Sequence, residues 1–113
     1  MKVLIVDDNE RVRTLLRDHL PTSADEIYEC SDGEDAIPLF RQHRPDWVLM
    51  DQEMQHMDGL TAIREIIEDF PKAKICMVTA FDDEELRNEA FRAGAVGFVV
   101  KDDLFQLTAI IAG

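Results

Sequence analysis

The sequence has little cysteine, no long apolar run and few positive charges. Its two cysteines, Cys30 and Cys76, both sit in apolar runs of a 113-residue chain, which excludes a disulfide framework or a cysteine-rich zinc cluster. No apolar run approaches the ~20 residues that cross a bilayer, and the first one, Val3–Val6, is far too short for a signal-peptide core. We therefore expect a cytoplasmic protein with two buried free thiols.

The charge balance is strongly acidic. There are 24 Asp and Glu residues against 12 Lys and Arg residues, so the net charge is −12. Sequence-blind binding of nucleic acid needs cations that neutralise phosphates, and anionic membrane surfaces also attract basic segments. We expect no direct binding of nucleic acid or membrane by this domain. The excess of acid is either a solvated surface or, in part, a set of carboxylates that converges on a cation.

Length and periodicity predict one α/β domain over residues 1–113. Short runs suited to strands occur at Val3–Val6, Glu26–Cys30, Trp47–Met50, Lys74–Val78 and Val96–Val100. Helical patterns lie between and after them, at about Asn9–Pro21, Ser31–His43, Leu60–Phe70, Asp82–Ala93 and Asp103–Ala112. This alternation predicts right-handed βαβ units and a parallel sheet with both faces covered.

Two local features refine this prediction. The strand Glu26–Cys30 carries polar residues, which favours an edge position in the sheet. Pro38 falls within the second helical pattern, where it fits only in the first turn or at a kink.

Polar residues directly follow the four predicted strands that are apolar runs. Asp7 and Asp8 follow the first strand, Asp51 the third, Thr79 the fourth and Lys101 the fifth. Each one alone has an ordinary explanation as a helix cap, a strand end or a surface charge. Because the carboxyl ends of parallel strands meet at one edge, where ligands bind in such sheets, their joint placement predicts a functional site.

The residue types at these strand ends suit phosphoryl transfer. Three close carboxylates repel one another, and hard oxygen ligands favour Mg²⁺, or Mn²⁺, over zinc. A carboxylate such as Asp51 can attack phosphorus and form an aspartyl phosphate. The Lys101 ammonium can neutralise charge on the transferred group, and the Thr79 hydroxyl can donate a hydrogen bond to it.

At these residues the sequence resembles the receiver domain of a bacterial two-component response regulator, and in particular the chemotaxis regulators. The resemblance covers nearly the whole chain and rests on four motifs in order: Val6-Asp7-Asp8; Val48-Leu49-Met50-Asp51 with Met57-Asp58-Gly59-Leu60; Val78-Thr79-Ala80; and Gly94 to Lys101. It implies a flavodoxin-like, doubly wound (βα)5 three-layer sandwich with strand order 2-1-3-4-5.

The resemblance also implies a phosphoacceptor and a metal site. Asp51 is the residue similar to the phosphoacceptor and is also a metal ligand. Asp8 would bind Mg²⁺ directly, Asp7 mainly through water, and the backbone carbonyl of Glu53 would complete the protein ligands. The domain would catalyse only its own phosphorylation and dephosphorylation, and would act as a switch instead of a metabolic enzyme.

Four further roles follow from the same resemblance. Lys101 would pair with the acceptor carboxylate and then with the phosphoryl group. Thr79 would bind the phosphoryl group, and Phe98 would be the aromatic switch that turns inward as Thr79 moves. Glu53 and Phe81, two residues beyond the acceptor and the threonine, would influence the phosphoryl lifetime. We expect Phe81 to shield the group from water, whereas Glu53 could oppose this by orienting water.

The implied phosphoryl donor is a phosphohistidine on a sensor histidine kinase or a histidine phosphotransfer protein. Phosphorylation would re-form the face made by the fourth helix, the fifth strand and the last helix. An output domain or a target protein is the candidate partner there, and a homodimer is a further candidate. The apolar ending Ile110–Gly113 suggests the N-terminal receiver of a longer regulator.

Three residues depart from the family pattern. Gln55 follows Met54 where most members have proline, so this loop gains backbone freedom. Asp102 follows Lys101 where most have a cis-linked proline, and this Lys-Asp pair resembles the subclass with helix-turn-helix output domains and a role in transcription regulation. Phe98 lacks the hydroxyl of a tyrosine, so no phenol hydrogen bond sets its orientation.

Two other functions are compatible with the fold class. A degenerate receiver would act as an interaction module without phosphorylation, although all five site residues are present. A flavin-binding electron carrier would need a Ser/Thr/Gly-rich phosphate loop after the first strand, and this chain has acidic residues there. His43 and His56 lack a third ligand at suitable spacing and are interpreted as surface histidines.

Overall fold

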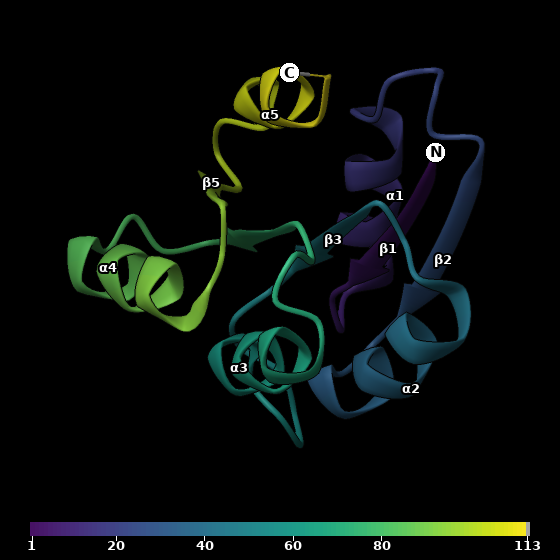
Figure 1. The fold of residues 1–113 in the computed structure, drawn as a ribbon. Coiled ribbons are helices and arrows are strands. Elements are labelled where there is room, and N and C mark those ends of the chain that lie inside the picture. The colour runs from purple at the N-terminus through teal and green to yellow at the C-terminus, as the bar shows by residue number, and fades with distance from the viewer. Residues whose placement is uncertain (113) are drawn as a thin grey trace.

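The chain forms a five-stranded parallel sheet with helices on both faces (Figure 1). The computed structural model describes residues 1–112. The strands are β1 (Lys2–Val6), β2 (Glu26–Cys30), β3 (Trp47–Met50), β4 (Ile75–Thr79) and β5 (Gly97–Val100). The helices are α1 (Glu10–Asp18), α2 (Gly33–His43), α3 (Gly59–Asp69), α4 (Glu84–Ala93) and α5 (Phe105–Ala112). The strand order β2-β1-β3-β4-β5 confirms the predicted flavodoxin-like fold.

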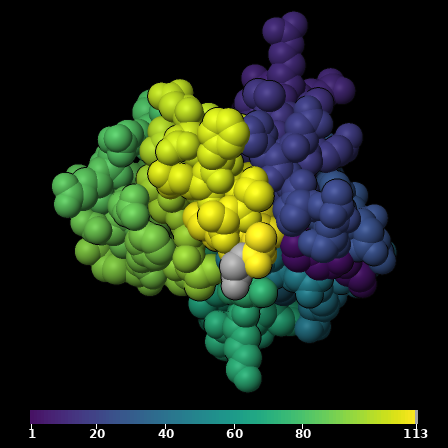
Figure 2. Space-filling model, turned by 90° about the horizontal axis from the view of Figure 1, so that it is seen from above, coloured from purple at the N-terminus to yellow at the C-terminus, as the bar shows by residue number. Residues whose placement is uncertain are grey.

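Two hydrophobic layers hold the helices to the sheet. Helices α1 and α5 cover one face of the sheet. Their apolar side chains pack on the residues of β1, β3, β4 and β5 that point to that face. Figure 2 looks onto this face and shows α5 beside α1. The contact includes a hydrogen bond of 2.9 Å from the Thr108 hydroxyl to the His19 carbonyl. Helices α2, α3 and α4 cover the other face with a second apolar cluster.

Side-chain caps fix where the helices begin. Asn9, Asp32, Asp58 and Asp83 precede α1 to α4 and accept hydrogen bonds from backbone N–H groups of the first turn, which satisfies donors without helical partners. Gly94 ends α4 in the left-handed region, with φ of 117°. The predicted helix positions are confirmed, although α4 and α5 begin two residues later than expected because Asp83 is a cap and α5 follows a turn.

The edge position of β2 is confirmed, and its polar residues make contacts with α1. Glu29 forms ion pairs with both Arg13 and Arg17. Pro38 lies in the second turn of α2, not the first, and is exposed to solvent. Both thiols are predicted to be buried. Cys76 is fully buried, whereas Cys30, on the edge strand, is only half-buried.

Within residues 1–112, no helix is both long and apolar enough to cross a lipid bilayer. Gly113, the last residue of the predicted domain, lies outside the described residues.

Candidate functional site

Two strand ends bring the acidic residues together. Asp7 and Asp8 follow β1, and Asp51 follows β3, which is the neighbour of β1 in the sheet. The backbone N–H of Asp51 donates to the Val6 carbonyl at 2.9 Å, and the N–H of Asp7 donates to the Cys30 carbonyl at 3.1 Å. These bonds extend the ladder beyond the strands, so both carboxylates leave the sheet at the same edge.

The three carboxylates form one cluster that ranges from core to surface. Asp7 is fully buried, Asp51 is 6% exposed, and Asp8 is open to solvent. One oxygen of each lies within 4.8 Å of the others. The Oδ1 atom of Asp7 accepts a hydrogen bond from the Asn9 N–H at 2.9 Å. Its Oδ2 atom is buried, and among residues 1–112 no group donates a hydrogen bond of normal geometry to it.

Lys101 reaches the cluster from the end of β5. Its Nζ atom lies 2.8 Å from Asp7 Oδ2, and it donates a hydrogen bond of 3.2 Å to Asp51 Oδ1. The Lys101 backbone N–H donates to the Thr79 carbonyl at 2.7 Å, which ties the lysine to the end of β4. One ammonium thus stands against two buried carboxylates, and the cluster keeps an excess of negative charge.

This excess sets the protonation behaviour of the site. Burial and the negative charge of Asp7 raise the pKa of Asp51 to about 6, and Lys101 offsets part of the increase. Burial alone would lower the pKa of Lys101, but its contacts with Asp7 and Asp51 outweigh burial and raise it. The lysine therefore remains charged, while the carboxylates repel one another.

The cluster has the features of a cation site. It offers hard oxygen ligands, among them the buried Asp7 Oδ2, whose one close partner among residues 1–112 is the Lys101 ammonium at 2.8 Å. One oxygen from each carboxylate lies within 4.8 Å of the others, so a single cation could contact all three residues. Beside it, Asp8 and Glu53 line a depression of about 490 Å³ together with Met54 and Gln55. The acidic site can therefore bind a metal, and the loop after β3 borders it.

Thr79 and Phe98 occupy the neighbouring strands β4 and β5. Thr79 is buried, and its hydroxyl oxygen accepts a hydrogen bond of 3.2 Å from the Phe81 N–H. Phe81 is 48% exposed, and it lines a cleft of about 360 Å³ with Glu53. Phe98 is only 5% exposed and belongs to the core cluster under α3 and α4. The Phe98 ring is thus inward, an orientation that the sequence left open.

Gln52, in the loop after Asp51, and Gly59, the first residue of α3, hold the site in shape, and sequence reasoning gave neither residue this role. The Gln52 side chain accepts a hydrogen bond of 2.9 Å from the Leu60 N–H. A Cβ on Gly59 would lie 2.1 Å from the Asp51 carbonyl oxygen, so only glycine permits this close approach of α3 to Asp51. The motif Met57-Asp58-Gly59 is the signal that pointed to this contact.

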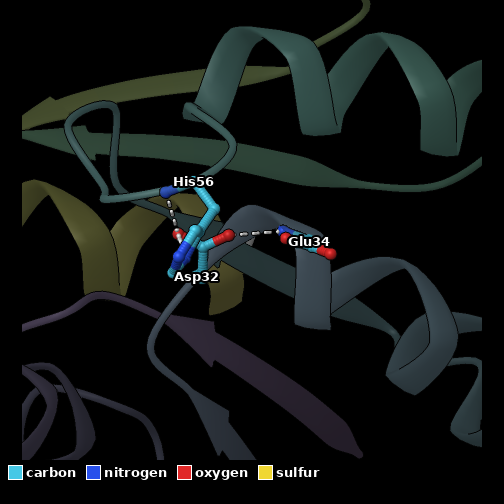
Figure 3. A group of neighbouring side chains, drawn as sticks. All are labelled: Asp32, Glu34 and His56. Atoms are coloured by element: carbon cyan, nitrogen blue, oxygen red, sulfur yellow. Dashed lines mark hydrogen bonds and ion pairs between the residues drawn. The ribbon is translucent and has the colours of Figure 1, made fainter.

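A second acidic group lies beside the first and includes His56. The fold brings Asp32, Glu34 and His56 together (Figure 3), which spacing along the chain did not reveal. Asp32 is buried, but its oxygens already accept hydrogen bonds from the N–H groups of Glu34, His56 and Met57. Burial opposes ionisation of Asp32, but these bonds prevail and lower its pKa. Its role is to cap α2 and to hold the loop that precedes α3.

Comparison with known proteins identifies relatives of the whole described chain. The family model of the response regulator receiver domain matches residues 3–112. The chemotaxis protein CheY of Thermotoga maritima is 38% identical over 111 residues, which cover 97% of this chain and 91% of that protein. The transcriptional regulatory protein YxjL of Bacillus subtilis is 39% identical over 106 residues, which cover 92% of this chain. The chain spans about half the length of YxjL, 49%.

A solved structure gives the same picture in three dimensions. The CheX–CheY–BeF3–Mg²⁺ complex from Borrelia burgdorferi matches with a TM-score of 0.85 and 31% identity, over 94% of this chain and 84% of the matched chain. That complex contains Mg²⁺ and a protein partner, CheX.

Proposed function

Because this chain belongs to the response regulator receiver domain family and serves in phosphorelay signalling, we propose that Asp51 is its phosphoacceptor. The observation that carries the proposal is the position of the Asp51 carboxylate. It is almost buried at the centre of the strand ends, between the Asp7 carboxylate and the Lys101 ammonium. The domain is a switch, not a conventional enzyme.

The donor in this proposal is a phosphohistidine of a sensor kinase or phosphotransfer protein. An Asp51 oxygen forms a bond to phosphorus as the N–P bond of the phosphohistidine breaks. The electron pair of that bond stays on the imidazole, which takes up a proton. Asp51 must be ionised to attack, and its pKa of about 6 leaves it mostly ionised at neutral pH.

Lys101 and Thr79 receive the phosphoryl group. Lys101 Nζ already donates a hydrogen bond of 3.2 Å to an Asp51 oxygen, so it can contact an oxygen of the added phosphoryl group with little movement. The Thr79 hydroxyl has a proton to donate, because in the described structure its oxygen acts only as acceptor for the Phe81 N–H. Phe81 and Glu53 line the adjoining cleft and control the access of water to the product.

We further propose that Asp7, Asp8, Asp51 and the backbone carbonyl of Glu53 hold Mg²⁺, or Mn²⁺ in its place. The buried Asp7 Oδ2 and the oxygen-only donor set fit this ion. When bound, Mg²⁺ supplies positive charge that offsets the charge on the transferred group. The Mg²⁺ in the related CheY complex supports the assignment.

The partners are proposed from the family. A sensor kinase or phosphotransfer protein would meet the site edge in the cytoplasm, and α4, β5 and α5 would form the face for an output domain, a target protein or a second copy. The similarity to YxjL supports an output in transcription. The phosphorylation-independent interaction module is the weaker alternative, because Asp7, Asp8, Asp51 and Lys101 lie in one cluster, which supports a phosphorylation site.

The test is phosphorylation by a small donor. The wild-type chain should gain one phosphoryl group from acetyl phosphate in the presence of Mg²⁺, measured by intact mass. Asp51→Asn should gain none, whereas Asp58→Asn, which removes an exposed carboxylate seven positions away, should react like wild type. Equal labelling of the Asp51 variant would contradict the assignment.

A further inference from the structure

The Phe98 ring has a cation against it. The Arg87 guanidinium, from α4, lies 5.7 Å from the Phe98 ring centroid and 5.8 Å from that of Phe91. Arg87 is exposed, and in the part of the chain described here it forms no ion pair. The guanidinium therefore lies near two aromatic rings, one on its own helix and one on β5.

The space beside the ring is acidic. Phe98 and Arg87 line an open hollow of about 260 Å³, whose other walls include three carboxylates, Asp82, Asp102 and Asp103. A ring that turned outward would enter this hollow and meet these groups. Because the face of an aromatic ring is negative, it attracts a cation such as Arg87 and is repelled by carboxylates. Both effects favour the inward ring.

From this arrangement we propose that Arg87 is a positioning residue that holds Phe98 inward before phosphorylation. The proposal deepens the proposed function, since it assigns a regulator to the proposed switch ring. It concerns the balance between two ring orientations in the unphosphorylated chain, which can be measured without any phosphoryl group.

The sheet register connects this ring to the phosphorylation site. Phe98 is paired with Met77 across β4 and β5, and Val100 is paired with Thr79. Side chains alternate between faces along a strand, so Thr79 lies on the same face as Met77, one step from Phe98. Phe98 therefore shares a face of the sheet with the residue proposed to bind the phosphoryl group, on the adjacent strand.

The expected effect follows from the size of a cation–π contact. At an exposed site such a contact changes an equilibrium by about two- to fivefold. Removing the guanidinium should shift the population of Phe98 toward the outward ring by that factor. Affinity for a phosphoryl analogue should fall by up to the same factor, because binding then has to restore the inward ring.

The first experiment measures the ring directly in the whole chain without Mg²⁺ or phosphoryl analogue. 4-Fluorophenylalanine is placed at position 98, and ¹⁹F NMR compares wild type with Arg87→Met, which keeps most of the apolar stem. Arg92→Met is the matched control, because Arg92 is exposed on the same helix and has no ring contact in the described structure. Arg87→Lys keeps the cation and should restore most of the wild-type spectrum.

A ¹⁹F resonance that moves toward its solvent-exposed position in Arg87→Met alone supports the proposal. An unchanged resonance, or an equal shift in Arg92→Met, overturns it. A second measurement titrates each variant with beryllofluoride and Mg²⁺, where Arg87→Met should bind up to about fivefold more weakly. If wild type itself does not bind beryllofluoride, the proposed function fails, and the ¹⁹F comparison still decides the role of Arg87.

Discussion

The Lys101 ammonium lies 3.2 Å from the Asp51 carboxylate, although 50 residues separate the two along the chain. The contact exists because β3 and β5 flank β4 and end at the same edge of the sheet. It leaves Asp51 with one cation and one close anion, Asp7. Two buried carboxylates therefore face one ammonium, and burial together with this excess of negative charge raises the pKa of Asp51.

The first prediction concerns pH and stability without metal. The folded-state pKa of Asp51 is about 6 against 3.8 for the unperturbed group. Between pH ~4 and ~6, Asp51 is therefore still protonated in the folded chain but already ionised in the unfolded chain. The stabilisation that comes from protonated Asp51 is complete below pH ~4 and is lost as the pH rises through ~6. Asp51→Asn has no group that titrates at this position. Its free energy of unfolding, relative to that of wild type, should therefore rise by about 3 kcal/mol between pH 4 and 7.5.

Urea unfolding in EDTA across this pH range measures the difference. Saturating Mg²⁺ should reduce the difference at pH 7.5, because the ion stabilises the wild-type site, with its ionised Asp51, more than the site of Asp51→Asn. A stability difference that does not change with pH would show that Asp51 ionises normally.

The second prediction concerns the metal. Mg²⁺ at about 100 times its dissociation constant should stabilise the wild-type chain by about 2.7 kcal/mol. Asp8→Asn should lose most of this gain while changing the metal-free stability by less than ~0.5 kcal/mol, since Asp8 is exposed. Calorimetric Tm values with and without MgCl₂ provide the measurement. Asp18→Asn, on the exposed side of α1, is the control and should respond as wild type does; a full Mg²⁺ response in Asp8→Asn would exclude it as a ligand.

The third prediction concerns the phosphoryl lifetime. Phe81 lines the cleft beside the site and leaves only part of its ring exposed. Phe81→Ala should admit water and shorten the lifetime severalfold, measured as release of phosphate from the phosphorylated chain. Glu53→Gln should lengthen it if this carboxylate orients the attacking water. An unchanged lifetime in Phe81→Ala would end the shielding hypothesis.

The fourth prediction concerns the second acidic group. Asp32 accepts three backbone N–H bonds from two segments, so Asp32→Ala removes a helix cap and leaves three part-buried donors without this partner. We expect a loss of about 2–3 kcal/mol in the free energy of unfolding. The exposed neighbour Asp35 offers the control Asp35→Ala, with little change. Stabilisation of wild type by Zn²⁺, absent in Asp32→Ala, would instead indicate a metal centre there.

Much of the fold and site could be predicted because strand ends are local signals. A buried apolar run followed by one polar residue marks where Asp51 or Lys101 leaves the sheet, and parallel topology then brings such residues together. The inward Phe98 and its contact with Arg87 depend on how α4 packs on β5, which no local pattern encodes. The sequence also did not predict that Asp32 both caps α2 and binds a second segment, because that segment is a loop 24 residues away.

The most direct test of the central claim locates the phosphoryl group itself. The wild-type chain is phosphorylated with acetyl phosphate and Mg²⁺ and treated with borohydride, which reduces an aspartyl phosphate to homoserine. Peptide mass spectrometry then reads the modified position. The structure predicts homoserine at position 51 alone, dependent on Mg²⁺. Homoserine at Asp7, Asp8 or any other acid, with Asp51 unmodified, would contradict the account.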